Sequence, residues 1–111
     1  MKYCCVLSTA PNLKKARQLA GLLVSGRLAA CVQLLPGLES HYRWKGWKET
    51  SKEVLILIKT RASLYKKLEA AILENHPYEV PEMVCLPITK GSKSYLDWLV
   101  QSTSNDKNLI C

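Results

Sequence analysis

Short apolar runs and one helical stretch make up the first part of the chain. Tyr3 to Ser8 is an apolar run followed by turn residues, which predicts a strand. From Leu13 to Ser25 the apolar side chains recur every three or four positions, which predicts a helix. Asn12 is placed to cap the start of this helix, and Gly26 is placed to end it.

The middle of the chain carries mostly strand-like patterns. The continuous apolar run Leu28 to Val32 predicts a strand that is buried on both faces and continues to a turn at Pro36-Gly37. Glu39 to Thr50 alternates and is aromatic, and Gly46 predicts a tight turn or a bulge within it. Glu53 to Thr60 is rich in β-branched residues and predicts the clearest strand of the chain.

The last part of the chain predicts a helix, a strand and a second helix. A helix capped by Ser63 runs to about Asn75. The turn His76 to Glu82 leads into a strand from Met83 to Leu86. A short C-terminal helix opens at Ser92. Its inward-facing residues are predicted to be Tyr95, Leu96, Leu99 and Val100.

The order strand, helix, strand, strand, helix, strand predicts an α+β, ferredoxin-like βαββαβ sandwich with a short C-terminal helix. We expect one domain over residues 1–103 and a frayed tail over residues 104–111. Such a fold packs both helices on one face of an antiparallel sheet and leaves the other face open. The apolar middle strands predict that this open face is an interface in an oligomer. The residues concerned are Tyr42, Trp44, Val54, Ile56 and Ile58.

Length and charge narrow the class of protein. The 111 residues and 48% hydrophobic composition suit one globular domain. No apolar run approaches the roughly 20 residues that span a bilayer, and no signal-peptide pattern is visible, so we expect a cytoplasmic protein. The net charge of +7 is spread without a block of five like charges. It indicates a solvated cationic surface, and we expect neither a nucleic-acid nor a membrane partner.

The five cysteines are an odd number, and none of them forms a CxxC pair. They are Cys4, Cys5, Cys31, Cys85 and Cys111. This usage argues against a disulfide framework and against a structural zinc site. Cys4 and Cys5 are adjacent and point to opposite faces of a strand, so we expect at most one of them to be exposed.

The segment from His76 to Glu82 concentrates the candidate chemistry. Its two prolines stiffen the backbone and hold an imidazole, a phenol and two carboxylates in one short turn. The plainer interpretation is a structural turn whose histidine satisfies a backbone group. Lys59, at the end of an apolar strand, could bind an anion if it is partly buried. Recognisable enzyme motifs are missing, so we expect no catalytic activity.

Several blocks of sequence resemble the CutA divalent-cation (copper) tolerance family, over about residues 3–103. Their order and spacing are specific. They are Thr9-Ala10-Pro11, Arg27-Leu28-Ala29-Ala30-Cys31-Val32, Glu39-Ser40, Tyr42-Arg43-Trp44-Lys45-Gly46, Glu53 with Lys59-Thr60, His76-Pro77-Tyr78-Glu79-Val80-Pro81-Glu82 and Tyr95-Leu96-Asp97-Trp98. The resemblance implies a ferredoxin-like fold and a cyclic homotrimer, in which the Tyr42-Trp44 hairpin reaches across to a neighbouring subunit.

The resemblance also implies a copper-binding or metal-response role. Family members with a copper site use a cysteine after the first strand and two adjacent histidines. The corresponding residues here are Ser8, Asn75 and His76, so only His76 carries over as a metal ligand. A hydroxyl and a carboxamide are poor substitutes for the thiolate and imidazole that copper prefers. Glu79 or a cysteine from another segment could assist His76.

Two alternatives stay open beside the metal hypothesis. The architecture resembles PII-type signalling trimers, which bind small anionic effectors between subunits. In that case a pocket between subunits would be lined by Cys31, Lys59, Glu79, Tyr95 and Trp98, with His76 nearby. The second alternative is a trimeric scaffold that presents its loops to a partner protein. The PII-type alternative is an analogy at the level of the fold, and a fold does not imply a function.

Overall fold

The first strand of the chain is an inner strand of the sheet. The computed structural model describes residues 1–104, and in it β1 (Tyr3–Ala10) pairs on one side with β3 (Trp47–Arg61). On its other side β1 pairs with β4 (Val84–Ile88). The strand β2 (Cys31–Trp44) pairs with β3 and completes an antiparallel sheet of order β2-β3-β1-β4. This arrangement confirms the predicted α+β class.

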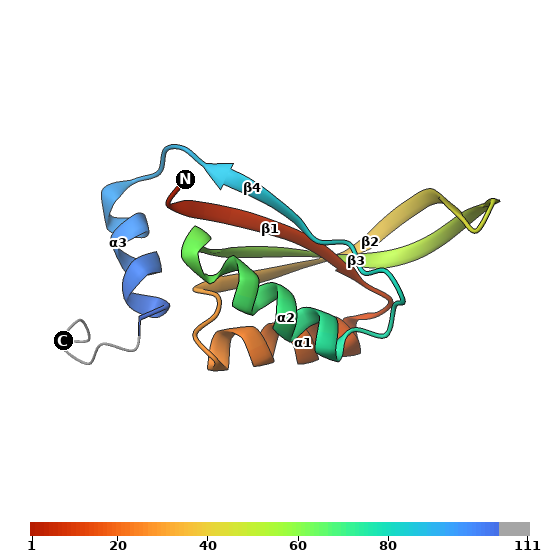
Figure 1. Ribbon diagram of the computed structural model, residues 1–111, viewed down its shortest axis with the longest axis horizontal. Coiled ribbons are helices and arrows are strands. Elements are labelled where there is room, and N and C mark those ends of the chain that lie inside the picture. Colours follow the sequence, from red (N-terminus) through yellow and green to blue (C-terminus); the bar gives the residue numbers. More distant parts are fainter. Residues whose placement is uncertain (105–111) are drawn as a thin grey trace.

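Two helices cover one face of this sheet, as Figure 1 shows. α1 (Leu13–Ser25) has the predicted bounds, and the side chain of Asn12 accepts a 2.8 Å hydrogen bond from the Lys15 amide, which confirms the predicted cap. α2 (Tyr65–Asn75) packs beside it. The apolar sides of both helices join β1 and β3 in the core. The core residues are Cys4, Val6, Ala10, Ala16, Leu19, Leu23, Ala29, Val54, Ile56, Ile58, Leu68 and Ile72.

The other two helical segments depart from the prediction in detail. The predicted cap at Ser63 is wrong, because a 3₁₀ turn at Ala62–Leu64 precedes α2 and no side chain caps that helix. α3 (Lys93–Ser102) lies apart from α1 and α2, beyond one end of the sheet (Figure 1). Leu99 is its buried residue, whereas Tyr95 is 39% exposed rather than directed inward. α3 packs against β3, and Leu96 and Val100 are partly buried beside Leu99.

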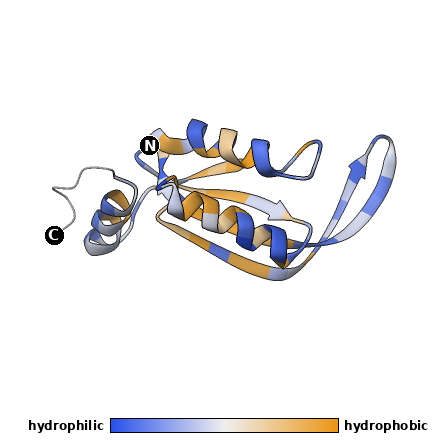
Figure 2. Ribbon diagram, turned by 90° about the horizontal axis from the view of Figure 1, so that it is seen from below, coloured by the Kyte–Doolittle hydropathy of each residue, from blue (hydrophilic) through white to orange (hydrophobic). Residues whose placement is uncertain are grey.

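The hairpin of β2 and β3 is longer than predicted. The predicted turn at Pro36-Gly37 is wrong, because β2 runs through it and absorbs it as a shift of register between Leu35 and Leu38. The chain turns instead at Lys45-Gly46, as Gly46 predicted. The hairpin projects beyond the helices and gives the molecule a length of 51 Å (Figure 1). Its far end is coloured hydrophilic in Figure 2, in contrast to the apolar body.

The start of β2 also differs from the prediction, which placed it at Leu28 because the apolar run begins there. Leu28, Ala29 and Ala30 lie outside the strand, which begins at Cys31. They follow Arg27, whose backbone has the left-handed φ of 57°. Ala29 and Ala30 are nevertheless buried, so their apolar character reflects packing and not strand geometry.

The two faces of the sheet carry different residues from those predicted. Val54, Ile56 and Ile58 belong to the core and face the helices, so their assignment to the open face is wrong. The open face carries the alternate residues, among which Leu35 is 58% exposed. Val84 and Leu86, on the edge strand β4, are 43% and 44% exposed. An apolar face without cover therefore exists, although other side chains form it.

Four cysteines lie in the described part of the chain as free thiols, and Cys111 falls outside it. Cys4 is fully buried and Cys5 is only partly so, as their adjacency predicted. Burial, and then the neighbouring Cys85 thiol, raise the pKa of Cys4 to about 12. Of the predicted frayed tail, residues 105–111 also lie outside the described range. No helix within residues 1–104 is long and apolar enough to cross a membrane.

Candidate functional site

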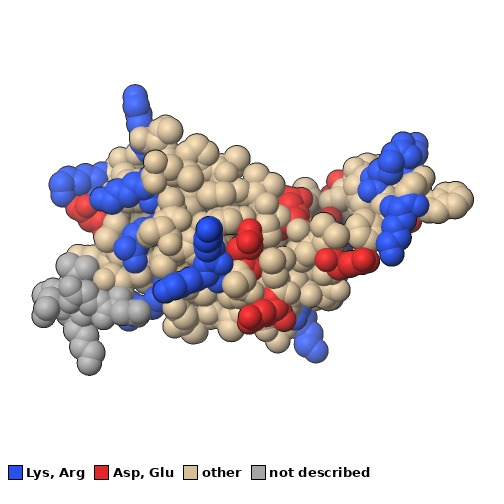
Figure 3. Space-filling model, in the orientation of Figure 1, with Lys and Arg blue, Asp and Glu red and all other residues tan. Residues whose placement is uncertain are grey.

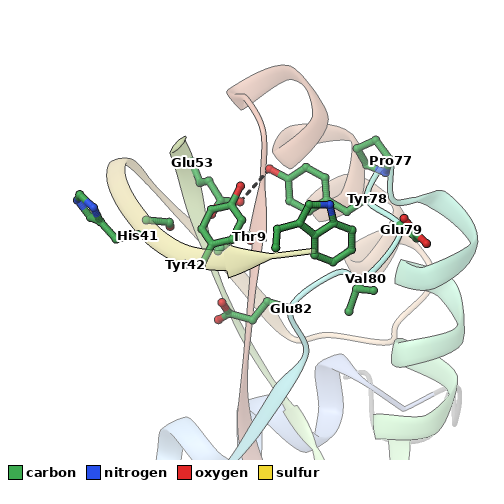
Figure 4. Close-up of a pocket in the computed structure, with 11 residues that line it drawn as sticks. Thr9, His41, Tyr42, Glu53, Pro77, Tyr78, Glu79, Val80 and Glu82 are labelled. Carbon is green, nitrogen blue, oxygen red and sulfur yellow. Dashed lines mark hydrogen bonds between the residues drawn. The ribbon is translucent and has the colours of Figure 1, made fainter. Parts of the chain in front are cut away.

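A buried carboxylate, Glu53, lies where the hairpin leaves the body of the protein. It is 9% exposed, and the hydroxyl of Tyr78 donates a 2.8 Å hydrogen bond to it (Figure 4). Ser40 and Thr9 also hydrogen bond to it. Burial alone would raise the pKa of Glu53, but the hydrogen bonds outweigh burial and lower the pKa below its ordinary value. The carboxylate is therefore ionised at neutral pH.

His76 holds the loop that carries Tyr78. It follows the last residue of α2 in the extended conformation that the next proline favours. Its Nε2 lies 2.6 Å from the carbonyl oxygen of Thr9, and its Nδ1 accepts a hydrogen bond of 3.1 Å from the Tyr78 amide. Because Nδ1 is the acceptor, Nε2 carries the proton and donates to Thr9. Both ring nitrogens are thus occupied, in agreement with the plainer interpretation of this histidine.

Between the hairpin and the loop from His76 to Glu82 lies a cavity of about 630 Å³. It is lined by Thr9, Ser40, His41, Tyr42, Trp44, Glu53, Pro77, Tyr78, Glu79, Val80 and Glu82. Figure 4 shows side chains of the loop facing those of the hairpin across it, whereas the His41 ring points away. That ring lies 2.8 Å from Glu39 and 3.3 Å from Thr50 on the hairpin.

The three positions implied as copper ligands do not form a donor set. Ser8 is fully buried, and its hydroxyl has no hydrogen-bond partner among the described residues. The Asn75 carboxamide donates a 2.8 Å hydrogen bond back to the carbonyl of Ala71 in α2. His76 has both nitrogens engaged. Within residues 1–104, no group of three or more His, Cys, Asp or Glu side chains is arranged to hold a metal ion. The residues present do not fit a copper ion.

The residues predicted for an anion pocket fall into two groups within one chain. Lys59 of β3 lies between Cys31 and Cys5 of the flanking strands, and its ammonium donates a hydrogen bond to Gln33. α3 packs against β3, the strand that carries Lys59. Burial, and then the Cys31 and Cys5 thiols, raise the pKa of Tyr95 of α3.

Trp98 belongs to the same group, because its ring centroid lies 5.5 Å from that of Tyr95. Glu79 belongs to the other group, because it lines the cavity, 3.5 Å from the Lys45 ammonium of the hairpin. The structure therefore brings four of the five predicted residues together and separates Glu79 from them.

Sequence reasoning missed the role of Glu53 and of the residues that bind it. Thr9, Ser40 and Tyr78 come from three separate segments, so no local spacing connects them with Glu53. One signal was present, since Glu53 is a charged residue that opens an apolar strand run. Such a residue is rarely buried unless it has partners.

Known proteins share both the sequence and the fold of this chain. The sequence profile described as "CutA1 divalent ion tolerance protein" matches residues 4–102. The chain belongs to the CutA1 divalent ion tolerance family. It is 48% identical over 98 residues to the divalent-cation tolerance protein CutA of Thermus thermophilus, covering 88% of this chain and 95% of that protein. The crystal structure of CutA1 from Oryza sativa superposes with a TM-score of 0.91 at 43% identity, covering 96% of this chain and 97% of the other.

Relatives in the CutA1 family differ in length. The chain is 47% identical over 100 residues to the chloroplastic protein CutA of Arabidopsis thaliana, which covers 90% of this chain. It spans only 55% of the length of that plant protein, or about half. The residues shared with both relatives are therefore those of the domain described above.

Proposed function

We propose that this chain acts in tolerance of divalent cations as a homotrimeric member of the CutA1 family. The observation that carries the proposal is the match over 95% of the Thermus relative, which bears that function in its name. No catalytic step is part of the proposal, since the relatives are named for tolerance and not for a reaction. We place the protein in the cytoplasm, although the Arabidopsis relative is named as chloroplastic.

The exposed apolar face supports the trimer. Leu35, Val84 and Leu86 leave apolar surface uncovered, and an uncovered apolar face usually marks an interface. The strands β2 and β4 form the two edges of the sheet, and an edge strand has free backbone groups that can pair with another chain. The hairpin residues Tyr42 and Trp44 would contact a neighbouring subunit.

Sedimentation equilibrium tests this assembly directly. The expected mass is three times that of the chain. Leu35→Lys, which puts a charge on the open face, should lower the mass. Leu22→Lys is the matched control, because Leu22 is 42% exposed on α1, away from that face, and its substitution should leave the mass unchanged. A wild-type monomer, or equal effects of both substitutions, would exclude the proposed interface.

Direct copper binding through His76 is the narrower form of the proposal. A metal at Nδ1 would have to displace the Tyr78 amide, and a metal at Nε2 would have to displace the Thr9 carbonyl and the proton. Since neither Ser8 nor Asn75 offers a compensating donor, we expect weak binding at most. The metal response would then act through this loop without a preformed copper centre.

Calorimetric titration of the reduced, metal-free protein with buffered Cu(II) tests this form. His76→Ala removes the one imidazole of the loop, and His41→Ala is the matched control on the hairpin. Saturable binding at a fixed ratio per subunit that is lost only in His76→Ala would establish His76 as a ligand. Equal heats for the wild type and both variants would exclude copper binding at His76.

A further inference from the structure

Two of the free thiols, those of Cys4 and Cys85, are neighbours on the helix-facing side of the sheet. In the register of β1 with β4, Cys4 pairs with Pro87 and Val6 pairs with Cys85, so the two cysteines are diagonal neighbours on one face. That face is the core side, since Cys4 is fully buried in the core and Cys85 packs against it. The open face of the sheet, which the trimer would cover, takes no part in the pair.

The spacing of this pair suits a bridging ion better than a disulfide. Diagonal neighbours in an antiparallel pair of strands have Cα atoms about 7–8 Å apart, whereas a disulfide usually needs less than about 6.8 Å. Both cysteines are free thiols in the structure. Two thiolates bound to one metal ion in a line lie about 4.6 Å apart, which is twice a metal–sulfur bond of about 2.3 Å. A metal ion can therefore join the two sulfur atoms where a disulfide would require the strands to move.

The donors at this place select a soft ion of low coordination number. Thiolates favour Cu(I) and zinc, but a structural zinc ion needs four ligands. Within residues 1–104, no group of three or more His, Cys, Asp or Glu side chains is arranged to hold a metal ion. β4 has no charged residue, and Figure 3 shows the surface along it largely free of Lys, Arg, Asp and Glu side chains. Cu(I) accepts two thiolates in a line, so a pair of thiols without further donors suits it.

Both thiols have to lose their protons when an ion binds. Burial, and then the Cys85 thiol, raise the pKa of Cys4 to about 12, so this thiol is protonated at neutral pH without a metal ion. A metal ion removes the proton of a thiol that coordinates it. Binding therefore releases protons, and the affinity rises with pH. Cys85 is only partly buried and lies on an edge strand of the sheet, which gives the ion a route to Cys4.

We propose that Cys4 and Cys85 form a linear, two-coordinate binding site for Cu(I). As the ion binds, the S–H bonds of both thiols break, two copper–sulfur bonds form and two protons leave to solvent, without transfer of an electron. The site is separate from Ser8, Asn75 and His76, whose donors do not fit copper. It goes beyond the proposed function, which concerns divalent cations, and it depends neither on the trimer nor on binding at His76.

Competition for Cu(I) with the chromophoric chelator bicinchoninate tests the site on the full chain, without oxygen and with ascorbate as the reductant. The wild type should take one Cu(I) per chain from the chelator. Cys4→Ala and Cys85→Ala should each weaken binding by more than about a hundredfold, since losing a residue that merely supports a ligand already costs about 10- to 100-fold. Cys85→Ala changes a partly buried position, so the test does not depend on the folding of the Cys4 variant.

Cys31→Ala is the matched control, because Cys31 is a partly buried thiol on β2, a strand that does not pair with β1 or β4. It should leave the affinity unchanged. X-ray absorption of the copper-loaded wild type should show two sulfur neighbours of the ion and no nitrogen neighbour. Tight binding that persists in Cys4→Ala and Cys85→Ala, or an equal loss in Cys31→Ala, would overturn the inference. A nitrogen neighbour, or one ion shared by two chains, would also overturn it.

Discussion

Tyr78 and Glu53 are 25 residues apart in the chain and are joined by a 2.8 Å hydrogen bond from a phenol to a buried carboxylate. The bond fixes the loop after α2 to the strand β3. Tyr78→Phe removes the donor and should lower the free energy of unfolding by about 1.5–3 kcal/mol, because the acceptor is charged and buried. Urea denaturation at neutral pH measures this loss.

Tyr42→Phe is the matched control for that substitution. The Tyr42 hydroxyl lies 3.4 Å from that of Ser51 in an exposed contact. Its removal should change the free energy of unfolding by less than about 0.5 kcal/mol. An equal loss in both variants would show that the bond from Tyr78 to Glu53 contributes no more to stability than an exposed hydroxyl contact does.

The pH dependence of stability should carry the signature of Glu53. Its pKa is lowered in the folded protein, so its contribution is present above the pKa of the unfolded chain and is lost as the pH falls through the folded pKa. Wild-type stability should therefore decline below about pH 4. Glu53→Gln should show a shallower decline, measured by urea denaturation at a series of acidic pH values. Parallel profiles would show that other carboxylates cause the acid sensitivity.

Ser8 should be replaceable without loss of stability. Its hydroxyl is fully buried and has no hydrogen-bond partner among the described residues, so it has a desolvation cost without a compensating bond. Ser8→Ala should leave the free energy of unfolding unchanged or raise it by up to about 1 kcal/mol. Thr60→Val is the control, because the buried Thr60 hydroxyl donates a 2.7 Å bond to Leu28 and its loss should cost about 1–3 kcal/mol. A clear loss in Ser8→Ala would indicate a partner for this hydroxyl.

The end of α1 should be stabilised by a glycine. Arg27 has a left-handed φ of 57° just after the cap at Gly26, a position that favours glycine. Arg27→Gly should raise the free energy of unfolding by about 0.5–1 kcal/mol. The same change inside the helix, Arg17→Gly, should lower it by about 1 kcal/mol. Thermal unfolding compares the two, and a loss in both variants would mean that Arg27 makes a contribution larger than its strain.

The elements that depend on local pattern were predictable from the sequence. The helix from Leu13 to Ser25 has the predicted bounds, because its period and its cap lie within the same stretch of chain. Pro36-Gly37 was wrongly assigned to a turn, because its structure is decided by contacts with another strand. A turn and a bulge have the same local chemistry, and only the pairing of Leu35 with Leu55 and of Leu38 with Glu53 decides between them.

The site was predictable only in part, because residues that are contiguous in the sequence can be identified from it, whereas contacts between distant segments cannot. The loop from His76 to Glu82 was identified because its prolines and its chemistry are contiguous. The position of Glu53 within the site depends on contacts from β1, β2 and the loop, which no spacing in the sequence reveals. Lys59 and Cys31 were grouped by analogy with PII-type trimers, and the register of β2 with β3 makes them cross-strand neighbours within one chain. Cys5 becomes a neighbour of Lys59 only through the register of β1 with β3.

The inner position of β1 has a consequence for the order in which the chain can fold. This strand precedes the other strands of the sheet along the chain, and both of its hydrogen-bonded neighbours, β3 and β4, come much later. The hairpin of β2 and β3 can form early from adjacent segments, whereas β1 has to wait for them. Until β4 joins the sheet, Cys4 lacks the strand that carries Cys85 beside it. The rate at which Cys4 becomes resistant to alkylation should therefore report the last step of assembly of the sheet.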